Sequence, residues 1–393
     1  MLDRAANRGM ALSVEPLRVE FLSGLDEMRA LRQRWETLNG TLSDHDAPFF
    51  QSWAWCLHVA TVRVSRAGTR YRPLVALVWE DRELIGIWPL SLQRMSGASV
   101  ARMLDDPFGQ FAGVAFKTPS SLTPGVLAVI RALRSGRVCD GLLVENVIEG
   151  SGLYAALASA GAHRHFGNEA VYVDLDQCTT IESFRHDLNK KTLKNLRNLS
   201  NRLQRVLATE HLTISQRNDA LGRIMTWTFD GRVEWMQSRA RTSPAFREQE
   251  FRMLLDTLSS SEVSLLAFSL QGGSTMVAAQ WGFTYLRKYY AYMSARNPSF
   301  DEFSPGRMHL GMVIESCLGQ GLKGLELMAP PSGYKLDWTR LTKRVDRFSM
   351  PFNPRGYLAI DILANRLEPL LRRASRRLPH AIRQPLIGMI NRR

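Results

Sequence analysis

The stretch from residue 265 to residue 293, LLAFSLQGGSTMVAAQWGFTYLRKYYAYM, decides the fold. Residues 265–270 are apolar and β-prone, residues 271–274 (QGGS) predict a turn, and residues 276–283 (MVAAQWGF) return as a longer strand. Residues 289–293 predict one more strand. Apolar runs on both sides of a glycine-rich turn are typical of a β-hairpin.

The same order occurs earlier in the chain. Residues 74–79 and 84–90 predict a hairpin around a charged turn. The elements expected after it are strands at residues 111–116 and 141–147 and a helix near residues 124–134. We therefore expect two copies of one unit in which strands and helices form layers, which is an α/β (α+β layered) fold class.

The length of 393 residues suits two packed units. Hydrophobic residues make up 45% and charged residues 22%, so the chain can bury a core. We expect an N-terminal half at residues 1–180, a C-terminal half with the ligand site at residues 181–350, and a basic appendage at residues 351–393.

Basic residues outnumber acidic ones by 51 to 37, which favours anionic partners. Residues 185–205 hold seven basic side chains and one acid, Asp187, with leucines at helical spacing. This helix has either a solvated face or a phosphate-attracting rim. Residues 363–393 hold eight arginines and one acid, Glu368, so peripheral contact with an anionic membrane or with nucleic acid is open for this segment.

Several protein classes are not favoured. The four cysteines lie far apart without a CxxC pair, and the eight histidines show no metal spacing or serine-hydrolase order, so no metal is expected. There is no GxxxxGK[ST] or GxGxxG motif. No apolar run predicts a membrane span or a signal peptide, so we expect a cytoplasmic protein, at most peripheral to the inner membrane face.

Residues 304–310, SPGRMHL, open a predicted helix after the strand at residues 289–293. Pro305 is tolerated in a first helical turn, and Gly306 lets a ligand approach the backbone. Free amides and the helix dipole attract an anion such as pyrophosphate, and Arg307 adds a charge. Ser304 is equally consistent with an ordinary helix cap.

The strand predicted at residues 324–328 places Glu326 among apolar neighbours, which is costly unless the carboxylate is paired or used. A water-facing glutamate on an edge strand is the alternative. The segment that follows the strand brings Tyr334 and Lys335 towards the start of the SPG helix.

These stretches resemble the GNAT-type acyltransferases of the BioF2-like, cellulose-biosynthesis-associated (CelD-like) group. The resemblance covers most of residues 45–345. In the C-terminal half it rests on VAAQWGF, YYAYMSA, SPGRMHL, LEL and GYKLDW, and in the N-terminal half on PFFQSWAW, LIGIWPLSLQ and VYVDL before KKTLKNLRNLSNRLQR. One departure is Glu326, where related sequences usually carry Asp. Another is the loop Ala329, Pro330, Pro331, Ser332, where they carry Gly and an acid.

The resemblance implies a tandem GNAT-like acyl-CoA N-acyltransferase fold with two pseudo-repeated mixed sheets flanked by helices. It also implies acyl-CoA, with acetyl-CoA first, as co-substrate. The pyrophosphate would lie on Ser304, Pro305, Gly306, Arg307 and Met308, and Lys335 would help to neutralise it.

An amine acceptor must lose a proton before it attacks the thioester, and Glu326 is the candidate base. Tyr334, Tyr292 and, less directly, Tyr290 are candidates to protonate the thiolate, although strand aromatics are more often core residues. A backbone N–H near residues 290–293 would bind the carbonyl oxygen.

The acceptor class stays open among a small molecule, a sugar and a lipid-linked precursor, with a role in polysaccharide or cell-envelope synthesis. A FemX-like transferase that takes its acyl group from aminoacyl-tRNA is the second hypothesis, although nucleic acid is not the expected partner. A non-catalytic basic adaptor at membrane polysaccharide machinery is the third.

Overall fold

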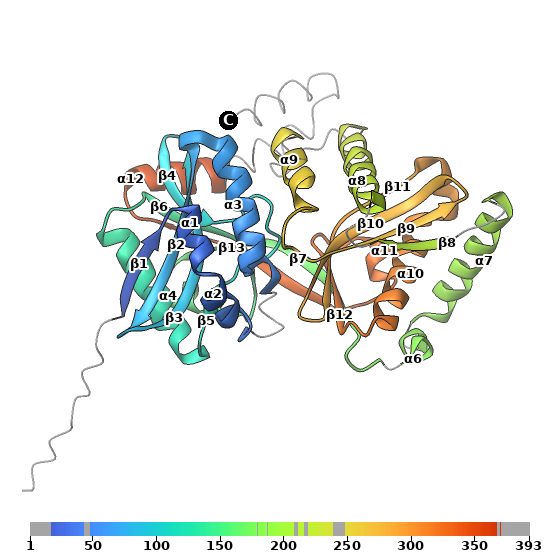
Figure 1. Cartoon of the computed structure of the whole chain (residues 1–393), viewed down its shortest axis with the longest axis horizontal. Coiled ribbons are helices and arrows are strands. Elements are labelled where there is room, and N and C mark those ends of the chain that lie inside the picture. The colour runs from blue at the N-terminus through green and yellow to red at the C-terminus, as the bar shows by residue number, and fades with distance from the viewer. Residues whose placement is uncertain are drawn as a thin grey trace, which may run out of the picture.

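The computed structural model describes residues 17–42, 48–178, 180–186, 188–207, 211–215, 219–238, 248–367 and residue 370. The N-terminal leader and most of the predicted basic appendage, residues 368–369 and 371–393, lie outside these residues. The predicted fold class is confirmed, because helices flank a large mixed sheet on both faces (Figure 1).

The N-terminal half begins with an edge strand and three short helices and continues with a meander. Its elements are β1 (Arg18–Leu22), α1 (Leu25–Ala30), α2 (Arg32–Asn39), η2 (Pro48–Gln51), α3 (Trp53–Ala67), η3 (Gly68–Arg70), β2 (Tyr71–Glu80), β3 (Glu83–Met95), β4 (Ala98–Met103), β5 (Ala115–Phe116), α4 (Pro119–Ser135), β6 (Gly141–Ile148), α5 (Gly152–Ser159) and β7 (His163–Asp174).

The C-terminal half repeats this order of helices, meander, helix and strand. Its elements are α6 (Ile181–His186), α7 (Lys190–Leu207), β8 (His211–Ser215), α8 (Asp219–Ser238), α9 (Glu248–Leu258), β9 (Leu265–Gly272), β10 (Thr275–Tyr285), β11 (Lys288–Arg296), η5 (Pro298–Phe303), α10 (Pro305–Gly319), β12 (Gly324–Met328), α11 (Gly333–Leu336), β13 (Thr342–Pro351), α12 (Pro354–Gly356) and η6 (Tyr357–Leu367).

The two predicted sheets join edge to edge. The strand order is β1-β2-β3-β4-β6-β13-β7-β12-β11-β10-β9-β8 in one 13-stranded sheet, with β5 paired to β3. Strand β13, from the end of the second half, lies between β6 and β7 of the first. The domain boundaries at residues 180 and 350 stay predictions, because the sheet runs through both halves.

Several sequence-based expectations differ from the structure in detail. Of the strand expected at residues 111–116, only Ala115–Phe116 pairs as β5, while Ala112 makes an isolated bridge to Val147. The segment after Pro331 is a short helix, α11, rather than an open loop. The sequence analysis missed β4 and β13, since their alternating polar residues face neighbouring strands or ion pairs instead of water.

Three large apolar cores hold the layers together, and a fourth, small one lies under η6. One core combines α1, α2 and α3 of the first half with α8 and α9 of the second, so it continues across the junction of the halves. A second packs α4 and α5 on the opposite face of the first half. The third packs α7 and α10 on the opposite face of the second half. Among the described residues, no helix combines the length and hydropathy needed to cross a bilayer.

Gly282 fixes a bulge in the β10–β11 hairpin. Trp281 pairs with Met293 and Gly282 with Ala291, so Tyr292 is an extra residue on β11. A Cβ atom on Gly282 would lie 1.9 Å from the carbonyl oxygen of Tyr290. Only glycine therefore lets the two strands approach at this bulge.

We expect Gly282→Ala to lower the free energy of unfolding by about 1 to 3 kcal/mol, because the backbone must move to relieve the clash. The matched control is Gly222→Ala in α8, where an added Cβ meets nothing within 4 Å. Gly222→Ala should raise the free energy of unfolding by about 0.5 to 1 kcal/mol, because alanine has a higher helix propensity than glycine. Denaturant unfolding measures both, and equal effects would contradict the role given to the bulge.

Candidate active site

The parallel strands β11 and β12 pair over three residues and then separate. The register ends at Tyr290 opposite Glu326, and beyond this point β12 pairs only with β7, on its other side. Past Tyr290, next to the Tyr292 bulge, no strand within the described residues pairs with the edge of β11 that faces β12. A gap of this kind can accept an extended ligand whose polar groups bond to the strand.

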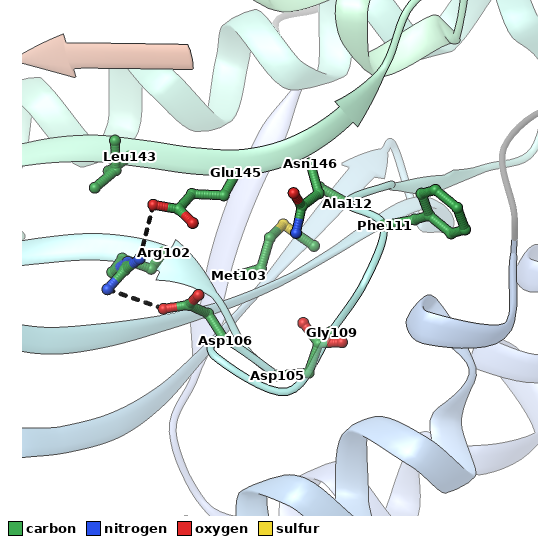
Figure 2. A pocket seen from close by; sticks show the side chains of 10 residues that line it. All are labelled: Arg102, Met103, Asp105, Asp106, Gly109, Phe111, Ala112, Leu143, Glu145 and Asn146. Carbon is green, nitrogen blue, oxygen red and sulfur yellow. Dashed lines mark ion pairs between the residues drawn. The ribbon is translucent and has the colours of Figure 1, made fainter. Parts of the chain in front are cut away.

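The N-terminal half contains the corresponding gap in a closed form. Its parallel strands β4 and β6 pair only at Val100 with Gly141 and at Ala101 with Leu142. Just past this pairing, Arg102 Nη1 lies 2.9 Å from Asp106 Oδ2 and Arg102 Nη2 lies 3.4 Å from Glu145 Oε1 (Figure 2). The remaining cavity measures about 10 Å³, enough for about one water. Of the two gaps, only the one between β11 and β12 is left as a candidate ligand site.

Glu326 lies at the point where β11 and β12 separate. Its side chain is 2% exposed. One carboxylate oxygen, Oε1, accepts a hydrogen bond from Lys343 Nζ at 2.7 Å, whereas Oε2 has no hydrogen-bond partner within the described part of the chain. A buried oxygen of a carboxylate without a partner is costly, which points to a group that binds there. The edge-strand alternative for Glu326 is therefore wrong.

Lys343 reaches Glu326 across the intervening strand β7. Its ammonium lies 5.0 Å from the ring centroid of Tyr172 on β7 and 5.2 Å from that of Phe111 in the N-terminal half. Cation–π contacts and the ion pair together compensate for the desolvation of both charges. The sequence analysis missed Lys343, because no pattern predicted the strand that carries it.

Aromatic side chains of the N-terminal half cover the same face of the sheet. Leu325 and Leu327 belong to the core beneath α10, so Glu326 between them faces the opposite side, where the halves meet. Tyr290 shares that face, and its ring lies 5.3 Å from Phe49 and 6.1 Å from Phe50. The PFFQS stretch thus packs on Tyr290, the residue that pairs with Glu326 in the β11–β12 register.

Tyr292 and Tyr334 occupy different surroundings. The Tyr292 hydroxyl donates to the carbonyl oxygen of Phe108 at 2.9 Å. Burial raises the pKa of Tyr292 well above its usual value, and the Asp105 carboxylate adds to this shift. Tyr334 is half-buried at the start of α11 and packs against the core beneath α10. The roles of both tyrosines as proton donors stay predictions.

The SPG stretch begins α10 as the sequence predicts. Ser304 adopts a left-handed conformation with φ of 51°, and Pro305 is the first helical residue. The amides of Arg307 and Met308 already donate to the Ser304 carbonyl oxygen, at 3.0 and 3.4 Å. Gly306 keeps an N–H that has no acceptor within the part of the chain that the structure describes. The pyrophosphate site therefore stays a prediction, and it has fewer free backbone amides than the sequence analysis expected.

The two cations expected beside this helix start have protein partners. Arg307 Nη2 lies 2.6 Å from Asp337 Oδ2. Lys335 Nζ donates to the carbonyl oxygens of Met328 and Pro330, at 3.0 and 3.1 Å. Burial lowers the pKa of Lys335 to about 8, with a smaller contribution from Arg232. Lys335 thus holds the loop after β12 through two hydrogen bonds. A ligand phosphate must compete with these carbonyls for Lys335 and with Asp337 for Arg307.

A groove between α7 and α10 opens next to the helix start. Its cavity measures about 240 Å³. Its wall contains both apolar and polar side chains, and its residues are Arg185, Leu193, Leu196, Arg197, Ser200, Asn201, Met308, Gly311, Met312, Glu315 and Trp338. Arg185 pairs with Glu315 across the rim. The groove is therefore open to a ligand with an apolar part and a negative charge.

Exposed cations also lie on α7, and one of them, Arg197, lines this groove. None of these cations has an ion-pair partner among the residues with described positions; they are Lys190, Lys191, Lys194, Arg197 and Arg205. The helix has 18 residues and is about 27 Å long. Exposed cations of this kind fit both a solvated face and a phosphate-attracting rim, so both interpretations of α7 stay predictions.

A buried carboxylate outside the predicted site lies close to Tyr292. Asp105 is 2% exposed, and its Oδ2 accepts a hydrogen bond from Trp55 Nε1 at 2.8 Å. Burial raises the pKa of Asp105 to about 7, and Trp55 opposes the shift. No pattern in the sequence singles Asp105 out, because its neighbours Asp106 and Pro107 are typical of a surface turn. Among the described residues, no cluster of three or more His, Cys, Asp or Glu side chains could hold a metal ion.

Residues 190–336 match the family model of the acetyltransferase (GNAT) domain. The structure of FemX is similar, with a TM-score of 0.59 and 10% identity, over 88% of this chain and 100% of that chain. The C-terminal domain of a protein described as a lysylphosphatidylglycerol synthetase from Agrobacterium fabrum has a TM-score of 0.53 and 12% identity, over 86% and 96%. No curated protein matches the sequence.

These likenesses to solved structures show a shared fold, which extends through both halves. The family match lies in the half that contains α7, β11, α10 and β12. Residues 190–336 therefore carry a GNAT acetyltransferase domain, which indicates an acyltransferase.

Asp105 makes the stability depend on pH. The unfolded carboxyl loses its proton near 3.8 and the folded one near 7, so the folded state binds the extra proton between these values. The free energy of unfolding therefore falls as pH rises from about 4 to about 7. We expect the free energy of unfolding of Asp105→Asn to rise relative to that of the wild type by a few kcal/mol between pH 4 and pH 7. Above pH 7 the difference should stay constant.

Denaturant unfolding at several pH values measures this difference. Asp26→Asn is the control, because the Asp26 side chain is 97% exposed. A difference between Asp105→Asn and the wild type that does not vary with pH would mean that Asp105 titrates normally.

Proposed function

We propose that the protein transfers an acyl group from acyl-CoA, acetyl-CoA first, to an amine or sugar acceptor. The observation that carries this proposal is the free Oε2 of Glu326, buried where β11 and β12 separate. The carboxylate lies beside unpaired strand backbone within the GNAT-matching residues. A proton acceptor and a row of free backbone groups are what amine acylation needs at one place.

The two substrates enter from opposite faces of the sheet. The donor occupies the face with α10 and the α7 groove, where Gly306, Arg307 and the unpaired cations attract phosphate. The acceptor occupies the face with Glu326, where the N-terminal half contributes Phe50 and Phe111. The gap between β11 and β12 connects these faces, so the thioester and the amine meet inside it.

The residues of the chain supply proton transfer and positioning. An amine with a pKa near 10 is mostly protonated at neutral pH, so Glu326 Oε2 takes its proton directly or through water. Lys343 holds the other oxygen, which fixes the orientation of the carboxylate. A backbone N–H of β11 near Tyr292 donates to the thioester oxygen as negative charge develops on it. The thiolate needs little help to leave, since its pKa is near 8.5.

The biological setting rests on the resemblance to the BioF2-like, CelD-like group. That resemblance favours an acceptor in polysaccharide or cell-envelope synthesis, such as an amino sugar or a lipid-linked precursor, on the cytoplasmic side. The aromatic rings beside Tyr290 and Lys343, which neighbour Glu326, suit a sugar ring or another flat acceptor.

The basic surface of α7 also fits a second donor, aminoacyl-tRNA. The five exposed cations of α7 without an ion-pair partner among the described residues form a track that also suits a phosphodiester backbone, as a FemX-like use of aminoacyl-tRNA requires. Thermal unfolding in the presence of acetyl-CoA or of aminoacyl-tRNA separates these donors, since the true donor raises the melting temperature. Stabilisation by neither donor would favour the non-catalytic adaptor.

We expect Glu326→Gln to lower the turnover by about 10² to 10⁴-fold with unchanged affinity for acetyl-CoA, because the amide cannot take the proton. Thiol release with glucosamine or another amine measures turnover, and calorimetry measures affinity. The matched control is Glu169→Gln, an exposed glutamate on β7. Wild-type turnover in Glu326→Gln would remove the proton acceptor from the proposal.

We expect Arg307→Ala to weaken acetyl-CoA binding by about 1.5 to 3 kcal/mol through lost charge-assisted hydrogen bonds. The control Asp337→Ala removes the competing partner, so it should leave binding unchanged or strengthen it. If both variants lose affinity equally, the Arg307–Asp337 pair supports the structure only, and the phosphate assignment is wrong.

A further inference from the structure

The last described part of the chain exposes a cluster of large apolar side chains. Ten large hydrophobic residues are exposed in the described structure, and four of them are Tyr357, Leu358, Leu367 and Leu370. Their exposed fractions are 46%, 53%, 43% and 58%. The other six are scattered, so this concentration distinguishes one surface from ordinary isolated exposure.

The inner side of η6 is fixed on the N-terminal half (Figure 1, beside α12). Ala359 and Ile360 pack against Ala98, Val100 and Leu143 in a small core. Hydrogen bonds anchor η6 as well: Asp361 accepts one from Ser349 at 3.3 Å, and Asn365 accepts one from Arg347 at 3.1 Å. The outer side of η6 therefore has a defined orientation.

The exposed residues repeat along this outer side. In a π-helix each backbone hydrogen bond reaches the fifth residue along, so one turn takes slightly less than five residues. Leu358 and Leu367 are thus two turns apart on one side of η6, and the residues between them include the buried Ala359, Ile360 and Ala364. We call Tyr357, Leu358, Arg366 and Leu367 of η6, together with the exposed residues Arg355 before η6 and Leu370 after it, the C-terminal face.

The charge of this region is positive. Arg355 and Arg366 are exposed on the C-terminal face. The sequence then continues through residues 371–393, which lie outside the described residues and contain seven arginines and no acid. The same stretch includes aliphatic residues between the arginines, among them Leu371, Leu378, Ile382, Leu386, Ile387 and Ile390.

We propose that the C-terminal face docks on an anionic phospholipid bilayer. Exposed leucines beside a tyrosine can enter the boundary between headgroups and acyl chains, and arginines attract the anionic headgroups. The C-terminal face offers both kinds of side chain, apolar and cationic. An RNA partner would account for the arginines but not for the exposed leucines, so the lipid surface is the better fit.

Co-sedimentation of the full chain with vesicles tests this proposal. We expect binding to vesicles of phosphatidylcholine with phosphatidylglycerol and much weaker binding to phosphatidylcholine alone. The double variant Leu358→Glu with Leu367→Glu should lower the partition coefficient about tenfold or more, because it removes the apolar contact and repels the headgroups. Leu286→Glu, a change of the same type at a 46% exposed leucine in the β10–β11 turn, should bind as the wild type does.

Arg366→Glu keeps the proposal testable if the double variant melts below the wild type. It removes no apolar contact and should lower the partition coefficient about fivefold or more. Wild-type binding by a folded double variant, or by Arg366→Glu, would overturn the proposal. Equal binding to both kinds of vesicle would overturn it as well, and so would tighter binding to a single-stranded RNA than to anionic vesicles.

Discussion

The pair between Glu326 and Lys343 is the interaction on which the site depends. Its partners come from β12 and β13, two strands separated by β7, so the ion pair exists only because β13 lies inside the sheet. Removing one partner of a buried pair costs about 3 to 5 kcal/mol, since the remaining charge stays desolvated. The pair therefore links the orientation of the proposed proton acceptor to the way in which the two halves are joined.

The two halves show what distinguishes a ligand gap from a structural one. Both contain a short parallel strand pair that separates after two or three residues. In the first half, Arg102 fills the gap and pairs with Asp106 and Glu145. In the second half, one oxygen of Glu326 has no hydrogen-bond partner among the residues that the structure describes. The repeated unit thus supplies the same geometry twice, and the side chains decide which copy is available for chemistry.

Much of this arrangement could be predicted from local sequence. The hairpins, the helix that begins at Pro305 and the strand that carries Glu326 follow from apolar periodicity and turn residues. The position of β13 could not be predicted, because pairing between distant strands leaves no local pattern. For the same reason the sequence did not predict Lys343, Asp105 or the partners of Arg307 and Lys335. Each depends on contacts between segments far apart in the chain.

The placement of β13 also has a consequence for synthesis of the chain. Strand β6 has its parallel neighbour β4 on one side, but its other side is covered only by β13. During translation, that side of β6 and the facing edge of β7 stay without a partner until residue 351 has left the ribosome. Until then, both edges expose unpaired backbone groups that can pair with another chain and aggregate. The nascent first half is therefore expected to depend on chaperones, and shortening the chain before Thr342 would open the middle of the sheet instead of trimming its edge.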